Sequence, residues 1–219
     1  MANKMINKDT VVCISISKNA GNFGCNMHNK LFEEHNLNYI YKSFSVDNLE
    51  GALTGMRSFK IRGAGISMPY KQEVLSYVDR VSSEVAKIGA TNTIVNDNNV
   101  LTAYNTDAYS SYTLIKKIKE ETNFRDLVIL GRGGYSKAVK YSGEKLKMKI
   151  SQITRENWED IRLQKDKIIF NCTPVKNLQD IIDSSSRFID CNTDTETGSA
   201  LARLQGEKQF ELYTGIILP

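Results

Sequence analysis

The hydrophobic pattern divides the first half of the chain into short apolar runs separated by segments with helical spacing. The apolar runs predict strands at 10–17, 39–46 and 61–68, the last of them closed by Pro69. The helical spacing predicts helices at 25–36, 46–59 and 70–81, with Asp47 near the start of the second. Two β-runs within 91–105 flank the polar turn "NDNN", which is typical of a hairpin.

The second half alternates strands and helices more regularly. The pattern predicts a helix at 108–121, a strand, tight turn and helix at 126–146, strands at 147–154, 167–173 and 187–193, and a closing helix at 199–215. Strands that alternate with helices indicate an α/β fold built on a parallel sheet.

Composition and charge narrow the class of protein. The 219 residues suffice for one large domain or two small ones, and 41% hydrophobic with 25% charged residues is ordinary for a globular chain. The net charge of +4 suits a phosphate-bearing ligand but is too small to indicate nucleic acid. Four cysteines without a C-x-x-C pair, and only two histidines, argue against a metal site and favour reduced thiols. The opening "MANKMINKDT" has no apolar stretch and no segment reaches the length of a membrane span, so we expect a cytoplasmic protein.

The stretch "GRGGYSKAV" at 131–139 directly follows the apolar run "LVIL". Glycines between a strand and a helix leave backbone N–H groups at the helix N-terminus, where they attract phosphate. Gly131 permits the tight turn, Gly133 a close approach to a pyrophosphate, and Gly134 with Ala138 close packing of the helix on the strand. The spacing departs from the strict Rossmann pattern. From this segment alone, a phosphate-binding turn and a connection without a ligand are equally open.

The end of the following strand carries charges of both signs. Arg155 and Glu156 stand where a Rossmann domain contacts the adenosine ribose. An arginine there pairs with a 2′-phosphate, whereas an acidic residue suits a free 2′-hydroxyl. The pair therefore leaves NADP and NAD open, with Arg155 favouring NADP, and solvated charges at a strand end are the alternative.

Three short segments of the first half carry candidate chemistry. Lys71 follows a strand end and a proline, Asn92 starts a strand, and Asn105, Thr106 and Asp107 lie where the two halves meet. A lysine and a carboxylate in one cleft exchange or orient protons at a carbonyl or alcohol. Taken singly, a solvated lysine, a turn asparagine and a helix-capping aspartate explain these residues equally well.

Six blocks of the chain, in this order, carry a resemblance to one known family. They read "SMPYK", "IGATNTI", "YNTD", "GRGGYSKA", "NCTP" and "LQGEKQFELYTG". The chain thereby resembles shikimate dehydrogenase, whose blocks run N-V-T-x-P-x-K, I-G-A-x-N-T, N-T-D, G-A-G-G-A-x-R-A, N-x-T-P and L-x-x-Q-x-x-x-Q-F-E-x-W-x-G. The opening "ISISKNAGNFGCNMHNKLF" is most similar to the divergent shikimate dehydrogenase-like branch.

The resemblance implies a two-lobed α/β fold with the active site between the lobes. Residues 1–107, with the helix 199–219 returning, would form the substrate-binding catalytic lobe, and 108–198 a Rossmann-like NADP-binding lobe. The implied activity belongs to aromatic amino acid biosynthesis and reversibly reduces 3-dehydroshikimate to shikimate with NADPH. Lys71 would be the catalytic lysine, paired with Asp107. The substrate would be bound by Asn22, Ser67, Asn92 and Gln205, and the cofactor by Gly131, Gly133, Gly134, Ser136, Lys137, Thr154 and Arg155.

Two departures from the family pattern modify these expectations. Asn22 and Gly24 stand where the family holds the substrate carboxylate with two serines, which predicts weak affinity or a different substrate. The segment after "QITRENWEDI" has room only for a short turn or stub helix, so the cofactor lobe is expected to be shortened. A quinate or amino-shikimate dehydrogenase, and a catalytically weak ligand-binding relative, are the alternatives. A smaller sheet buries less apolar surface, and a homodimer would offset that loss.

Overall fold

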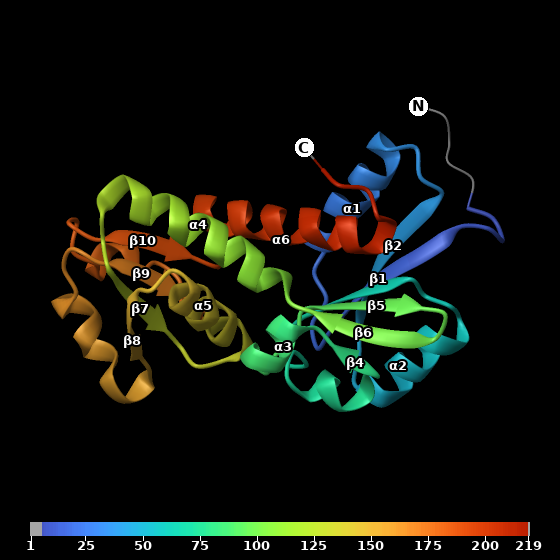
Figure 1. Ribbon diagram of the computed structural model, residues 1–219, viewed down its shortest axis with the longest axis horizontal. Coiled ribbons are helices and arrows are strands. Elements are labelled where there is room, and N and C mark those ends of the chain that lie inside the picture. Colours follow the sequence, from blue (N-terminus) through green and yellow to red (C-terminus); the bar gives the residue numbers. More distant parts are fainter. Residues whose placement is uncertain (1–5, 219) are drawn as a thin grey trace. The chain divides into compact units, whose positions relative to one another are not determined.

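The computed structural model describes residues 6–218 and divides them into two units, each with its own sheet (Figure 1). Unit 1 takes in 6–86, 91–105 and 206–218, and unit 2 takes in 87–90 and 106–205. The chain therefore crosses between the units at 86/87, 90/91, 105/106 and 205/206. Residues 1–5 and 219, which belong to the expected ranges 1–107 and 199–219, lie outside the described residues.

Unit 1 is built on a six-stranded mixed sheet. Its strands are β1 (Val11–Ser17), β2 (Tyr39–Ser45), β3 (Gly63–Ile66), β4 (Arg80–Val81), β5 (Thr93–Asp97) and β6 (Val100–Tyr104), in the order β2-β1-β3-β5-β6-β4. The helices of this part are α1 (Phe23–Glu34), α2 (Leu49–Ser58), η1 (Glu73–Tyr77) and α3 (Ser83–Ile88), which ends across the boundary. The strand β1 is parallel to both β2 and β3, whereas β5 is antiparallel to β3 and β6.

The predicted hairpin is confirmed, because β5 and β6 pair directly around the polar turn. Asn98 and Asn99 both have positive φ, at 53° and 71°. Two successive residues in that region make the turn that suits the twist of paired strands, and asparagine tolerates it. The polar run between two apolar runs was therefore a reliable signal.

The predicted helix at 70–81 is wrong. Only Glu73–Tyr77 is helical, as a 3₁₀ turn, and Arg80–Val81 forms the edge strand β4 beside β6. The Asp79 N–H donates to the Leu101 carbonyl at 3.0 Å, and the Leu101 N–H donates to the Asp79 carboxylate at 2.7 Å. Pairing with β6 supplies the backbone partners that a longer helix would have needed.

The second predicted helix begins later than expected. Asn48, whose side chain accepts from the Gly51 N–H at 2.9 Å, caps α2 at Leu49. Asp47 pairs instead with Lys18. Leu49, Leu53 and Met56 are buried along the inner face of α2 and pack in the core of unit 1.

Unit 2 is built on a four-stranded sheet in which every pairing is parallel. Its elements are α4 (Thr106–Thr122), β7 (Asp126–Leu130), α5 (Gly134–Lys145), β8 (Lys149–Ile153), η2 (Arg155–Leu163), β9 (Ile168–Asn171), η3 (Gln179–Ile181), β10 (Arg187–Asp190) and α6 (Glu196–Thr214). The order β10-β9-β7-β8 leaves β8 at one edge of the sheet.

This sheet confirms the shortened Rossmann-like lobe. The connection after β8 is the 3₁₀ segment η2, as expected, and it leads directly into β9, which pairs with β7. The central strand β7 is apolar from Leu127 to Leu130, and all four of these residues are buried. Such a run is typical of a parallel strand covered on both faces.

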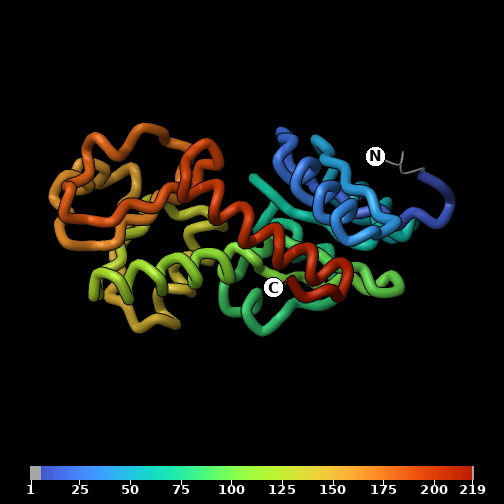
Figure 2. The backbone as a smooth tube through the Cα atoms, turned by 90° about the horizontal axis from the view of Figure 1, so that it is seen from above, coloured from blue at the N-terminus to red at the C-terminus, as the bar shows by residue number. Residues whose placement is uncertain are grey.

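The closing helix α6 begins at Glu196 and runs without a break to Thr214, so the chain passes along it from unit 2 into unit 1 (Figures 1 and 2). Within unit 1 its residues Phe210 and Tyr213 are buried in a cluster with Cys13, Phe32 and Tyr41. None of the helices described over 6–218 combines the length and the apolar character needed to cross a membrane.

Candidate functional site

The carboxyl ends of β1 and β3 bring three predicted residues to one edge of the unit 1 sheet. The Ser67 N–H donates to the Ile16 carbonyl at 2.9 Å, at the end of β1. The Thr91 N–H donates to the Lys71 carbonyl at 2.8 Å, and the Ile66 N–H donates to the Asn92 carbonyl at 2.7 Å. The backbone thereby ties the segments of Ser67, Lys71 and Asn92 to one another.

The loop after β1 lies along the same edge. The Lys18 N–H donates to the Met68 carbonyl at 3.2 Å, and the Ala20 N–H donates to the Ser45 hydroxyl at 3.0 Å. Asn22 stands at the N-terminus of α1, is exposed, and makes no capping hydrogen bond with its side chain. Ser15, upstream of this loop, directs its hydroxyl to Ser43 at 2.8 Å.

Asn92 is the centre of a buried hydrogen-bond network that residue patterns alone did not predict. The Thr93 hydroxyl donates to Asn92 Oδ1 at 2.9 Å. Gln209 Nε2 lies 3.2 Å from the Asn92 carbonyl oxygen and 3.0 Å from Thr93 Oγ1, while its Oε1 lies 3.2 Å from His28 Nε2. All four residues are buried. The available signal was the position of Gln209 four residues after Gln205, on the same face of one helix.

In unit 2 the glycine turn follows β7 as predicted. Gly131 has φ +96°, and a Cβ there would lie 2.8 Å from Thr173 Cγ2. Its N–H donates to the Ile153 carbonyl at 2.8 Å, and Gln152 Nε2 donates to its carbonyl at 2.5 Å. These bonds fix the turn against the end of β8.

Gly133 occupies the N-cap position of α5, with φ −78°. Nothing lies within 4 Å of the Cβ that a larger residue would place there. The backbone at the start of this twelve-residue helix is therefore open to a ligand. The Ser136 side chain is buried and donates to the Gly133 carbonyl at 2.8 Å, while Lys137 is half-buried on the next turn position.

The end of β8 carries the charged residues expected near an adenosine. Glu156 lies 3.6 Å from Arg132 in the glycine turn and accepts a hydrogen bond from the Thr154 hydroxyl. That hydroxyl and the neighbouring Arg132 and Arg155 lower the pKa of the Glu156 carboxyl. Arg155 and Glu156 are both exposed. Arg132, which the patterns did not single out, therefore belongs to the same charged group.

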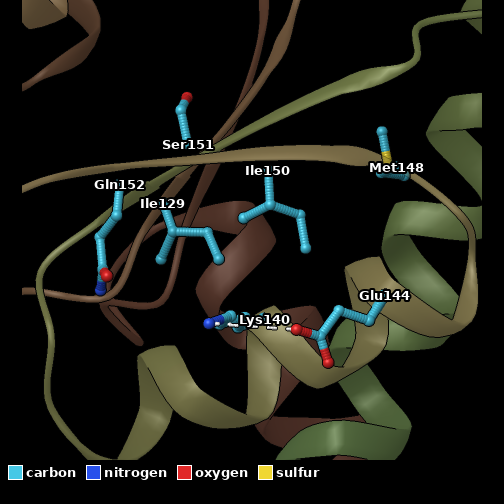
Figure 3. Close-up of a pocket in the computed structure, with 7 residues that line it drawn as sticks. All are labelled: Ile129, Lys140, Glu144, Met148, Ile150, Ser151 and Gln152. Atoms are coloured by element: carbon cyan, nitrogen blue, oxygen red, sulfur yellow. Dashed lines mark ion pairs between the residues drawn. The ribbon is translucent and has the colours of Figure 1, made fainter.

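A hollow of about 340 Å³ lies between α5 and β8 in unit 2 (Figure 3). Ile129, Met148 and Ile150 form its apolar lining, and the Lys140–Glu144 ion pair, with a 4.0 Å separation, crosses its rim. None of the predicted site residues lines it. The hollow is therefore not part of the candidate site.

The remaining predicted residues lie on helices. Asp107 is buried in the first turn of α4, and Gln205 is half-buried on α6, and both belong to unit 2. The four cysteines, all within 6–218, form no disulfide, and Cys13 is buried, which raises the pKa of its thiol to about 12. Within 6–218 no three acidic, cysteine or histidine side chains gather as a metal site would require.

The family model of the shikimate dehydrogenase substrate-binding domain matches residues 22–94. A shikimate dehydrogenase-like protein of Haemophilus influenzae is 34% identical over 96% of this chain and 93% of its own length. The chain belongs to the shikimate dehydrogenase family. The likeness to that relative supports the divergent, shikimate dehydrogenase-like branch that the sequence blocks indicated.

Two further matches differ in how much of the chain they cover. The solved structure of a shikimate 5-dehydrogenase-like protein superposes with a TM-score of 0.83 at 30% identity, covering 98% of this chain and 95% of that one. A shikimate dehydrogenase (NADP(+)) of Caldanaerobacter subterraneus is 41% identical, but over only 52% of this chain and 41% of its own length. The fold of this family of oxidoreductases is thus matched end to end, whereas the likeness to the NADP-named enzyme spans about half of the chain.

Proposed function

We propose that this chain catalyses the reversible NADPH-dependent reduction of 3-dehydroshikimate to shikimate. Unit 1 would bind the ring acid and unit 2 the cofactor. The observation that carries the proposal is the meeting of Ser67, Lys71 and Asn92 at the carboxyl edge of the unit 1 sheet. Polar residues at the carboxyl ends of strands are where α/β enzymes bind small ligands.

The chemistry needs a cation and a proton at the reacting oxygen. Reduction of a ring carbonyl develops negative charge on its oxygen, and the Lys71 ammonium would stabilise that charge and supply the proton. In the reverse direction the neutral Lys71 amine would accept the proton of the hydroxyl. Asp107, Asn92, Ser67 and Gln205 would bind the hydroxyls of the ring and hold it in place.

The residues of unit 2 fit a phosphate-bearing dinucleotide. The open backbone at Gly133 and the start of α5 offer donors for a pyrophosphate, with Gly131, Gly134, Ser136 and Lys137 in the same turn. Thr154 and Arg155, with Arg132 nearby, suit a 2′-phosphate, which favours NADP over NAD. When bound, the reduced nicotinamide would supply the hydride to the ring carbon.

One observation favours a related ring acid as a second candidate. The exposed Asn22, without a capping bond, stands where the family places a serine for the substrate carboxylate. A changed carboxylate contact would alter affinity by about 1.5–3 kcal/mol for each lost charged hydrogen bond. The altered loop around Asn22 would then be a change of specificity, with quinate or an amino-substituted ring acid as the substrate.

The test measures the absorbance of the reduced nicotinamide after the purified chain is mixed with shikimate and NADP+. Parallel assays replace shikimate by quinate and NADP+ by NAD+. We expect turnover with shikimate and NADP+, and a loss of about a thousandfold in kcat for Lys71→Ala. Lys30→Ala, which removes an exposed lysine paired at 3.7 Å with Glu34 on α1, is the matched control and should retain activity. Turnover by Lys71→Ala at the wild-type rate would remove Lys71 from the chemistry, and no turnover with any pair would overturn the dehydrogenase assignment.

A further inference from the structure

We propose that Gln209, Thr93 and His28 form a positioning chain that turns the Asn92 amide so that its nitrogen end donates to an oxygen of the bound ring acid. The inference rests on the proposed function, because it takes Asn92 as a substrate-binding residue. The three partners are positioning residues, since they act on the substrate only through Asn92.

The first link fixes the orientation of the Gln209 amide. The Asn92 carbonyl oxygen, 3.2 Å away, can only accept, so the end of Gln209 that faces it must be the nitrogen. The same nitrogen lies 3.0 Å from Thr93 Oγ1. The Gln209 oxygen therefore faces the opposite way, toward His28 Nε2 at 3.2 Å.

The second link fixes the direction of the Thr93 hydroxyl. Because Thr93 Oγ1 accepts from Gln209, its own proton is directed to Asn92 Oδ1 at 2.9 Å. An amide whose oxygen accepts on one side presents its nitrogen on the other. The hydrogen bond at Oδ1 therefore fixes the side of the amide on which Asn92 Nδ2 donates.

The third link is a neutral His28. Its Nε2 must donate, because the Gln209 oxygen it faces can only accept. Burial lowers the pKa of His28 to about 4, so the ring carries no charge near neutral pH. Within 6–218 its buried Nδ1 has no hydrogen-bond partner, which costs less free energy for a bare acceptor nitrogen than for an N–H. Tyr41 stacks on the ring with centroids 4.4 Å apart, which holds its plane.

The orientation has a consequence for specificity. A donor at Asn92 Nδ2 favours a ligand atom with a lone pair, such as the oxygen of a ring hydroxyl. An ammonium group at the same ring position offers only donors and would leave two donors facing each other. The chain of hydrogen bonds thus selects a hydroxylated ring acid over one with an amine at that position.

The experiment measures the kinetics of variants at Thr93 and Gln209. Thr93→Val keeps the branched shape but removes the hydroxyl, and we expect the KM for shikimate to rise about tenfold with kcat changed less than threefold and the KM for NADP+ unchanged. Thr93→Ser restores the hydroxyl and should restore the KM. Gln209→Leu should raise the same KM, because Thr93 loses the donor that orients it.

Thr91→Val is the matched control. Thr91 is equally buried and its hydroxyl donates to the Thr93 carbonyl at 3.0 Å and the Tyr104 carbonyl at 2.5 Å, but it makes no bond to the Asn92 side chain. A merely structural role predicts that Thr91→Val and Thr93→Val behave alike and that KM follows the loss of stability. The positioning role predicts that only Thr93→Val raises the KM.

The outcomes separate this inference from the proposed function. If the wild-type chain turns over shikimate and Thr93→Val leaves the KM unchanged, the positioning chain is overturned and the dehydrogenase assignment stands. If the wild-type chain shows no turnover but binds shikimate in calorimetry, the same tenfold change is expected in Kd, and its absence overturns the inference. If shikimate and quinate neither react nor bind, both proposals are overturned.

Discussion

The polar side chains at the carboxyl edges of the two sheets differ in charge and in exposure to solvent. In unit 1 the network around Asn92 is neutral, buried and joined by hydrogen bonds, with Asn92 2% and Gln209 8% exposed. In unit 2 the corresponding residues are charged and in water, with the side chains of Arg132 and Glu156 75% and 65% exposed. A neutral amide can be buried when its polar groups find partners, whereas charged side chains cost less free energy when they stay in solvent.

This difference decides what holds each edge in place. The Asn92 network depends on side-chain packing from β5, α1 and α6, so its geometry is as rigid as the core. The edge of unit 2 depends on the backbone of the turn at Gly131 and Gly133, and its charged side chains add little rigidity. Substitutions should therefore have large effects in the turn and the buried network and small effects among the exposed charges.

The largest effect is expected at Gly131. Gly131→Ala forces an alanine to φ +96° and brings its Cβ to 2.8 Å from Thr173 Cγ2. The strained backbone and the overlap together should lower the free energy of unfolding by about 3 kcal/mol. The measurement is the urea midpoint of the purified variant, followed by the KM for NADP+.

Gly133→Ala is the matched variant in the same turn. Its φ is ordinary and its Cβ meets open space, so we expect a change in stability below about 0.5 kcal/mol. The KM for NADP+ should nevertheless rise about tenfold, because the methyl group occupies the approach of the phosphates. Equal loss of stability in both variants, or an unchanged KM in Gly133→Ala, would contradict the assigned turn.

The second-largest effect is expected at His28 in unit 1, which should lower the free energy of unfolding in acid. Burial holds the pKa of His28 at about 4, below the value of about 6.5 in an unfolded chain. Between these values the unfolded chain binds a proton that the folded chain does not. Stability is therefore full above pH 6.5 and falls as the pH drops toward 4, by about 2 kcal/mol at pH 5.

The measurement is the urea midpoint between pH 8 and 4.5 for the wild-type chain and His28→Gln. The variant should lose this part of the pH dependence, even if it is less stable at pH 8. His35→Gln, which removes the exposed histidine at the end of α1, should keep the dependence. The claim that His28 is buried and neutral is wrong if His28→Gln and the wild-type chain lose stability in parallel.

Much of the fold was readable from the sequence, and the misses have physical causes. The apolar runs located the long strands, and the hairpin was marked by asparagines that accept positive φ. The helix expected at 70–81 failed because β4 pairs with β6, where Arg80 lies beside Thr102, and periodicity cannot show a pairing between distant segments. The short run of η2 was anticipated because too few residues separate β8 from β9 for a full helix and strand.

The candidate site divides in the same way. Lys71 and Asn92 were singled out because each stands at the end or start of an apolar run, which local sequence reveals, whereas Ser67 was singled out by the family resemblance. Gln209 and His28 were missed because their meeting depends on packing between residues far apart in the chain. Arg132 and Glu156 come together for a related reason, since the end of β8 returns beside the glycine turn.

The smallest effect is expected at Glu156, and it tests whether the exposed charges of unit 2 matter at all. Glu156 shares its charge with Arg132 at 3.6 Å and would compete with a 2′-phosphate for that guanidinium. Glu156→Gln should therefore lower the KM for NADP+ about threefold at low salt and leave that for NAD+ unchanged, with the difference fading as salt screens the charges. Glu159→Gln removes an exposed carboxylate on η2, paired with Arg162 at 3.8 Å, and should change neither value. A rise in the KM for NAD+ would assign Glu156 to the ribose hydroxyl instead, and no effect would mean that the backbone turn alone determines cofactor affinity.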